Sequence, residues 1–185
     1  YKPLMNSRKM ITMAIESLLL LACRSSFLDN DKIYPPLGNL YLHQAIKQSK
    51  PHIKVKVTDN YSLDDIRWLE GFDAVGISIM TPQRAEARKI LEFIKLWKPG
   101  IKTIAGGPHC KYYFNDMKNE PWDYICVDDG ERAILKILEK PNERIISDNI
   151  PVLEWRSASN KPNRLDNALF LRGFNYKLNG RDTTT

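Results

Sequence analysis

The sequence predicts an α/β protein with a five-stranded parallel sheet in the order 2-1-3-4-5 and helices on both faces. The runs 18–23 and 74–80 are apolar on both faces, as strands in the middle of a parallel sheet should be. Segments with helical periodicity separate the strand candidates, which is typical of parallel βαβ units. The run 53–58 alternates strictly between apolar and polar residues, so it belongs at the edge of the sheet.

The first strand, 18–23, is followed by a polar loop, 24–32, that is long for a connection between a strand and a helix. Pro35-Pro36-Leu37-Gly38 then opens a helix, because the preset φ of proline suits a first helical turn. Apolar residues spread over a broad arc at 40–46, as packing on a sheet requires. The second strand, 53–58, follows this helix.

The same alternation continues to about residue 140, and the pattern then dissolves. The remaining predicted elements are a short helix (63–69), the third strand (74–80), a helix (83–98), the fourth strand (102–105), a helix (112–118), the fifth strand (122–127), a helix (132–138) and a short strand (151–155). The chain therefore divides into an N-terminal extension at 1–16, predicted to be disordered, a folded domain at 17–140 and a linker at 141–185.

Composition indicates one globular domain and restricts its partners. The chain has 185 residues, of which 43% are hydrophobic and 27% charged. Its net charge of +6 is scattered without a basic stripe, so we expect no nucleic acid partner. No charge-free run approaches ~18 apolar residues, so we expect no membrane span and a cytoplasmic protein. A basic start and Leu-Leu-Ala-Cys at 20–23 also fit a lipoprotein signal, although Glu16 interrupts the apolar stretch.

The motifs that are missing exclude several kinds of chemistry within this chain. Cys23, Cys110 and Cys126 are widely spaced, and neither CxxC nor CxxxCxxC occurs. A disulfide framework, a zinc site and an iron–sulfur site are therefore unsupported here. No GxGxxG follows the first strand and no GxxxxGK[ST] occurs, so dinucleotide and P-loop sites are poor interpretations.

The predicted strand order places a ligand site at the carboxyl ends of the strands. In the order 2-1-3-4-5 the sheet reverses direction between strands one and three, and ligands bind in the crevice at that point. The residues at this edge are 23–26, Asp59, 78–82, 106–109 and 128–131.

Several of these residues have two interpretations each. Gly106-Gly107 can admit an extended ligand against bare backbone or can make a tight turn. Ser78 lies in an apolar strand, where its hydroxyl needs a backbone carbonyl or a ligand atom as a partner. Thr81 is most simply a helix N-cap. His109 can act as a metal ligand or proton shuttle, but it has no second ligand at suitable spacing and fits a structural turn residue better.

At this point the motifs, in their order and spacing, match a known module. They are PPLGNLYL at 35–42, VTD at 57–59, DAVGISIMTP at 73–82, AGGPH at 105–109 and DGE at 129–131. The chain resembles, over about 18–138, the N-terminal cobalamin-binding domain of cobalamin-dependent radical SAM enzymes. The resemblance implies a Rossmann-like (flavodoxin-like) sheet that holds cobalamin with its nucleotide tail buried beside the sheet.

The resemblance also implies the cofactor-binding residues. Ser78, Gly106 and Gly107 would line the pocket of the nucleotide tail. The residues that would border the corrin ring are Leu37, Gly38, Met80, Thr81, Pro82, Pro108 and His109. Asp59 and Glu131 complete the candidate set. The chain lacks the Asp-x-His-x-x-Gly motif, so a base-off cobalamin without a protein histidine on cobalt is implied.

In this family a linker leads into a radical SAM domain, which carries the CxxxCxxC motif. That motif is absent here, so we expect a fragment that binds cobalamin and is inactive alone. The full-length protein would then also hold a 4Fe-4S cluster and S-adenosylmethionine, and a methyltransferase is one candidate activity. Two alternatives stay open: a docking or regulatory module of the same fold with an empty pocket, and a flavodoxin-like flavin binder.

Overall fold

The computed structural model describes residues 14–25, 28, 30, 35–127, 129–139, 145–146, 175–178 and 181–184. Its elements in chain order are β1 (Ser17–Ala22), α1 (Leu37–Ser49), β2 (Lys54–Thr58), the 3₁₀ helix η1 (Ile66–Leu69), β3 (Ala74–Ser78), the 3₁₀ helix η2 (Thr81–Gln83), α2 (Arg84–Trp97), β4 (Lys102–Gly106), α3 (Pro108–Tyr112), α4 (Phe114–Met117), β5 (Tyr124–Cys126), α5 (Gly130–Glu139), β6 (Ile145–Ile146), β7 (Asn175–Leu178) and β8 (Arg181–Thr184). The strand predicted at 151–155 lies outside the described residues.

The main sheet has the order β2-β1-β3-β4-β5-β6, and all of its strand pairs are parallel. The predicted five-stranded order 2-1-3-4-5 is confirmed, with β2 at the edge. In the central register, Leu20 of β1 lies opposite Val57 on one side and Gly76 on the other. Gly76 in turn lies opposite Ile104 of β4. The sheet has one strand more than predicted, because β6 is only two residues long and leaves no periodic signal.

Some element boundaries differ from the sequence prediction for local reasons. The helix predicted at 112–118 is two short helices, the first of which begins at Pro108, directly after the Gly107 turn. The segment predicted as a short helix at 63–69 forms the 3₁₀ helix η1. Within the predicted linker, β7 and β8 pair as an antiparallel hairpin in a sheet of their own. Of the predicted extension 1–16, residues 1–13 lie outside the described residues, and Ile15 is buried.

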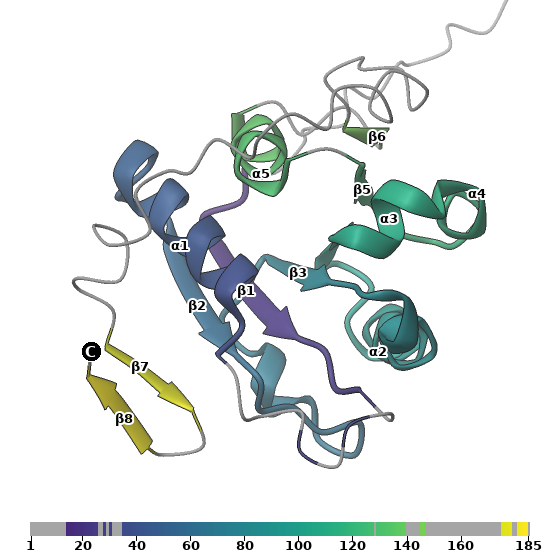
Figure 1. Cartoon of the computed structure of the whole chain (residues 1–185), viewed down its shortest axis with the longest axis horizontal. Coiled ribbons are helices and arrows are strands. Elements are labelled where there is room, and N and C mark those ends of the chain that lie inside the picture. Colours follow the sequence, from purple (N-terminus) through teal and green to yellow (C-terminus); the bar gives the residue numbers. More distant parts are fainter. Residues whose placement is uncertain are drawn as a thin grey trace, which may run out of the picture.

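Two hydrophobic layers cover the two faces of the sheet. Helices α1 and α5 lie on one face, and α2 and α3 lie on the other (Figure 1). Leu18 and Leu20 belong to the layer under α1 and α5, whereas Leu19 and Leu21 belong to the layer under α2. All four leucines are at most 1% exposed, which is why this run has no polar alternation. Burial as a central strand thus accounts for the apolar run that also resembled a signal sequence.

Among the residues that the structure describes, no helix combines the length and the apolar character needed to cross a bilayer.

Two aspartates hold the amino ends of the strands together. Asp73, just before β3, accepts hydrogen bonds from the backbone N–H groups of Glu16 and Ser17 and from the Ser17 hydroxyl. Asp123, just before β5, accepts from the N–H of Thr103 at 2.9 Å and from its hydroxyl at 2.8 Å. These two carboxylates therefore join neighbouring strands at the edge opposite the predicted ligand site.

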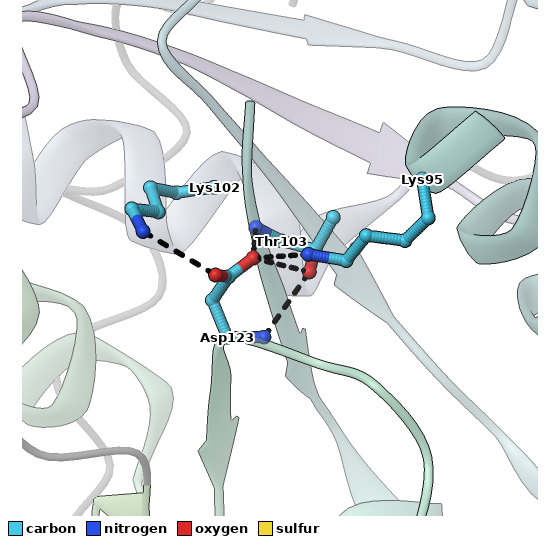
Figure 2. A network of polar contacts seen from close by, with 4 residues as sticks. All are labelled: Lys95, Lys102, Thr103 and Asp123. Atoms are coloured by element: carbon cyan, nitrogen blue, oxygen red, sulfur yellow. Dashed lines mark hydrogen bonds and ion pairs between the residues drawn. The ribbon is translucent and has the colours of Figure 1, made fainter. Parts of the chain in front are cut away.

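Lysines complete the Asp123 network, as Figure 2 shows. Lys95 Nζ lies 2.6 Å from one carboxylate oxygen of Asp123, and Lys102 Nζ lies 3.4 Å from the other. Burial raises the pKa of Asp123, but the hydrogen bonds from Lys95 and Thr103 outweigh it, so the pKa lies below its ordinary value. The folded state therefore favours the charged carboxylate.

We expect Asp123→Asn to lower the free energy of unfolding at neutral pH by about 1–3 kcal/mol, because the buried donors lose a charged acceptor. A depressed pKa stabilises the fold above the ordinary value of 3.8, and this contribution is lost as the pH falls through the lower pKa of the folded state. Urea titrations of both proteins at several pH values measure the difference. Asp64→Asn removes an exposed charge and is the control. A difference that persists unchanged well below pH 3.8 would contradict this account.

Candidate functional site

A cavity of about 230 Å³ lies between the sheet and helices α1 and α5. Glycines replace side chains on this face of two adjacent strands, at Gly76 of β3 and Gly106 of β4. A Cβ at Gly76 would meet the Leu20 side chain, and one at Gly106 would meet Cys126; both neighbours line the cavity. The lining residues are Leu20, Gly38, Asn39, Leu42, Gly76, Ile77, Ser78, Ile104, Gly106, Gly107, Pro108, Cys126, Gly130, Glu131 and Ile134. The missing side chains thus open a mostly apolar space beneath the helices.

A second cavity, of about 370 Å³, lies at the carboxyl edge of the sheet. It shares Gly38, Asn39, Ser78 and Pro108 with the first, so the two cavities adjoin. Its lining residues are Ala22, Cys23, Arg24, Ser25, Leu28, Pro35, Pro36, Leu37, Gly38, Asn39, Asp59, Ser78, Met80, Gln83 and Pro108. They come from the carboxyl ends of β1, β2 and β3, where the strand order reverses, from the start of α1 and the residues before it, and from Pro108 of α3. The structure therefore has an outer cavity at the predicted switch point and an inner cavity that continues beneath α1 and α5.

Gly107 has a different role from Gly106, although the two are adjacent. Its φ is +91°, and a Cβ there would lie 2.8 Å from the backbone N of Ile79 and 2.9 Å from Ser78 Oγ. Gly106 has an ordinary backbone conformation, and a Cβ there would lie 3.6 Å from Cys126 Cβ. The sequence allowed Gly106-Gly107 either to make a tight turn or to leave room for a ligand. In the structure Gly107 makes the turn, and Gly106 leaves room beside the cavity.

Backbone and side-chain hydrogen bonds fix the loops that carry the site. The N–H of Ile79 donates to the Gly106 carbonyl at 2.8 Å, and the N–H of His109 donates to the Ile79 carbonyl at 2.9 Å. Gln83 accepts from the N–H of Met80 and donates to the Cys23 carbonyl at 2.6 Å. The loops after β1, β3 and β4 are therefore joined to one another by hydrogen bonds beside the outer cavity.

The structure brings together nine of the twelve candidate cofactor-binding residues. Those that line one or both cavities are Leu37, Gly38, Asp59, Ser78, Met80, Gly106, Gly107, Pro108 and Glu131. Thr81 and Pro82 lie instead in a separate shallow depression with Arg84 and Ala85. Thr81 is also not an N-cap: it is the first residue of η2, and its hydroxyl lies 3.3 Å from His109 Nδ1.

His109 packs into the protein interior and lines neither cavity. Its side chain is 1% exposed and stacks on Tyr113, with ring centroids 5.2 Å apart. Burial, and then the charge of Arg84, lower its pKa, so the ring is neutral at neutral pH. Its position and contacts fit the structural interpretation of this histidine better than the metal-ligand one.

Asn39 and Gly76 are the main lining residues that sequence reasoning did not select. Asn39 is 2% exposed, although it follows Gly38 in the first turn of an otherwise apolar helix. A polar residue in the buried arc of a helix can indicate a ligand contact, because a buried amide needs a hydrogen-bond partner. Gly76 also carries a signal, since a glycine within a strand often marks a close approach. Neither signal tells which cavity the residue lines.

Two buried polar side chains of the outer cavity have no partner among the described residues. Nδ2 of Asn39 and Oδ2 of Asp59, whose side chain is 7% exposed, make no hydrogen bond. Burying such a group without a partner costs about 1–3 kcal/mol. The site therefore holds one donor and one acceptor that a polar ligand can satisfy.

Neither a protein-bound metal nor a reactive thiol is indicated in the described part of the chain. No group of three or more His, Cys, Asp or Glu side chains there is arranged to hold a metal ion. The three cysteines are buried, and none of them forms a disulfide. Burial raises the pKa of the Cys110 thiol to about 12, which makes it a weak nucleophile.

The parallel sheet, with adjoining cavities at and beneath its carboxyl edge, defines a Rossmann-like ligand-binding domain. The chain belongs to the family of the B12 binding domain, which matches residues 31–138. This membership supports cobalamin as the ligand. Among solved structures, the chain is similar to the N-terminal domain of the hypothetical protein TM0182 from Thermotoga maritima. The two are 22% identical with a TM-score of 0.44, and the match covers 65% of this chain and 94% of that chain. No curated protein matches the chain significantly.

Proposed function

We propose that this chain is the N-terminal cobalamin-binding domain of a radical SAM enzyme, with a methyltransferase as one candidate activity. The observation that carries the cobalamin part is the pair of adjoining cavities, one opened by Gly76 and Gly106 and the other at the sheet edge. The inner cavity suits an elongated, mostly apolar group. The outer cavity is larger and has a greater number of polar lining residues, and it suits the body of a large ring.

The lining residues have distinct roles in this proposal. Gly76 and Gly106 leave room for the nucleotide tail against the sheet, and Ser78 lies where the two cavities meet. Leu37 and Met80 are about half exposed at the outer cavity, where they would cover the corrin ring and exclude water from it. When bound, cobalamin would supply a cobalt centre that can carry and transfer a methyl group.

The proposed binding mode is base-off, without a protein histidine on cobalt. In the described residues, neither cavity is lined by a histidine. The inner cavity offers the tail a place away from the corrin ring. A cobalamin bound in this way would have no nitrogen ligand on its lower face.

Adding hydroxocobalamin to the purified chain tests both cobalamin binding and the base-off binding mode. We expect the corrinoid to co-elute with the protein in gel filtration at a ratio of about one to one, because the two adjoining cavities together form one site in the proposal. After reduction to cob(II)alamin, the electron paramagnetic resonance spectrum should lack the superhyperfine splitting of a coordinated nitrogen. A folded sample without co-eluting corrinoid would refute cobalamin binding. A nitrogen-split spectrum would refute only the proposed binding mode.

The radical SAM context rests on the order and spacing of the motifs at 35–42, 73–82 and 105–109. In this proposal a C-terminal domain supplies the 4Fe-4S cluster and S-adenosylmethionine, and the full-length protein is cytoplasmic. The coding sequence after Thr185 tests the context directly. We expect a CxxxCxxC motif shortly after this position. A stop codon there would contradict the proposal of a radical SAM enzyme.

The open space over Gly106 also bears on the alternatives. A docking module with an empty pocket would be expected to fill this space with bulky side chains. A flavodoxin-like flavin binder would show a flavin absorbance band after purification. The open cavity over Gly106 and the match to the B12 binding domain both favour cobalamin binding over these alternatives.

A further inference from the structure

We propose that Asn39 and Asp59 recognise primary carboxamides on the edge of the corrin ring and so select fully amidated corrinoids over those that carry carboxylates. The inference rests on the proposed cobalamin binding and assigns the specificity of that same site. Both residues line the outer cavity, and each presents a buried polar atom without a partner in the described part of the chain.

Asp59 differs from the two aspartates at the opposite edge of the sheet. Asp73 and Asp123 each accept hydrogen bonds from backbone N–H groups and from a hydroxyl, and these contacts explain their presence. Asp59 is 7% exposed at the end of β2 and has no comparable contact among the described residues. A buried carboxylate without a donor is costly, and a donor on the bound ligand would remove that cost.

Asn39 presents the complementary case in the lining of the same cavity. It lies in the first turn of α1, is 2% exposed and lines both cavities. Its Nδ2 can donate two hydrogen bonds but makes none within the described structure. An apolar residue would fit this buried arc without the cost of an unpaired amide, so the amide group points to an acceptor on the ligand.

A primary carboxamide matches this pair because it offers a carbonyl acceptor and an N–H₂ donor. The carbonyl can accept from Asn39, and the N–H₂ group can donate to Asp59, which in its ionised form only accepts. The corrin ring of cobalamin carries several primary carboxamides along its edge. A carboxylate in their place has no donor for Asp59 and would repel it. The pair would therefore discriminate an amide from an acid at this position.

Arg24, the basic residue that lines the outer cavity, is held by other contacts. Its guanidinium donates to the Tyr61 carbonyl at 2.9 Å and lies 4.6 Å from the centroid of the Tyr61 ring. No ion pair joins it to Asp59 in the described part of the chain. This arginine therefore does not supply the missing partner of Asp59.

The test compares cobalamin with its b-, d- and e-monocarboxylic acids, in each of which one propionamide has been hydrolysed. Wild-type protein should bind at least one of these isomers about tenfold or more weakly than cobalamin, and Asp59→Asn should reduce that ratio to about threefold or less. Asn39→Leu should weaken cobalamin binding about tenfold without lowering the unfolding midpoint of the ligand-free protein. Asp64→Asn removes an exposed charge outside both cavities and should change none of these ratios.

The outcomes separate this inference from the function on which it rests. If the wild-type protein binds no cobalamin, the proposed function itself fails. If it binds cobalamin and all three isomers equally, or if Asp59→Asn leaves the ratio unchanged, only the carboxamide assignment fails. A large drop in the unfolding midpoint of Asn39→Leu would show a structural role for that amide and would overturn its assignment to the ligand.

Discussion

Replacing Gly106 with valine is expected to lower the affinity for cobalamin about 100-fold while the protein still folds. Gly106 has an ordinary backbone conformation in β4, and valine suits a strand. A Cβ there would make an ordinary contact with Cys126, and the two methyl groups would extend into the inner cavity of about 230 Å³. The valine would therefore occupy space that the proposed nucleotide tail needs.

Titration with hydroxocobalamin, followed by its visible spectrum, measures the loss of affinity. Gly100→Val is the matched control, because Gly100 lies outside both cavities and a Cβ there meets nothing within 4 Å. Circular dichroism and the unfolding midpoint verify that both variants fold. Normal cobalamin binding by a folded Gly106→Val protein would show that the tail does not enter the inner cavity.

Replacing Gly107 with alanine is expected to destabilise the protein by about 3 kcal/mol or more. The φ of +91° with a ψ of −178° belongs to a region that other residues rarely adopt. A Cβ would also lie 2.8 Å from the N and 3.0 Å from the O of Ile79, and backbone atoms in a joined loop cannot easily move away. The damage would affect the contact between the β3 and β4 loops.

The free energy of unfolding in urea measures this effect, and the alanine variant one position earlier is the control. Gly106→Ala places the same methyl group where the nearest side-chain atom is 3.6 Å away, so it should change stability by less than about 1 kcal/mol. Equal stabilities of the two variants would contradict the different roles assigned to these adjacent glycines.

The class of sheet and the order of its five main strands could be predicted from the sequence, and with them the edge of the sheet at which the candidate site was expected. Strand periodicity carries this information, because a strand buried on both faces is apolar throughout and an edge strand alternates, as 18–23 and 53–58 do. The carboxyl edge follows from the predicted order alone. The twelve candidate residues came from the motifs of the family resemblance, and nine of them line the cavities.

The different roles of neighbouring residues in one motif could be seen only in the tertiary structure. Gly106 opens a cavity and Gly107 closes a turn, because the direction of a missing Cβ depends on φ and on the loop that packs opposite. His109 turns into the interior against Tyr113, although it belongs to the same motif. The unpartnered atoms of Asn39 and Asp59 become visible only when the start of α1 and the end of β2 meet at one cavity. Hydrogen-bond satisfaction depends on neighbours far apart in the chain, and local sequence patterns do not record them.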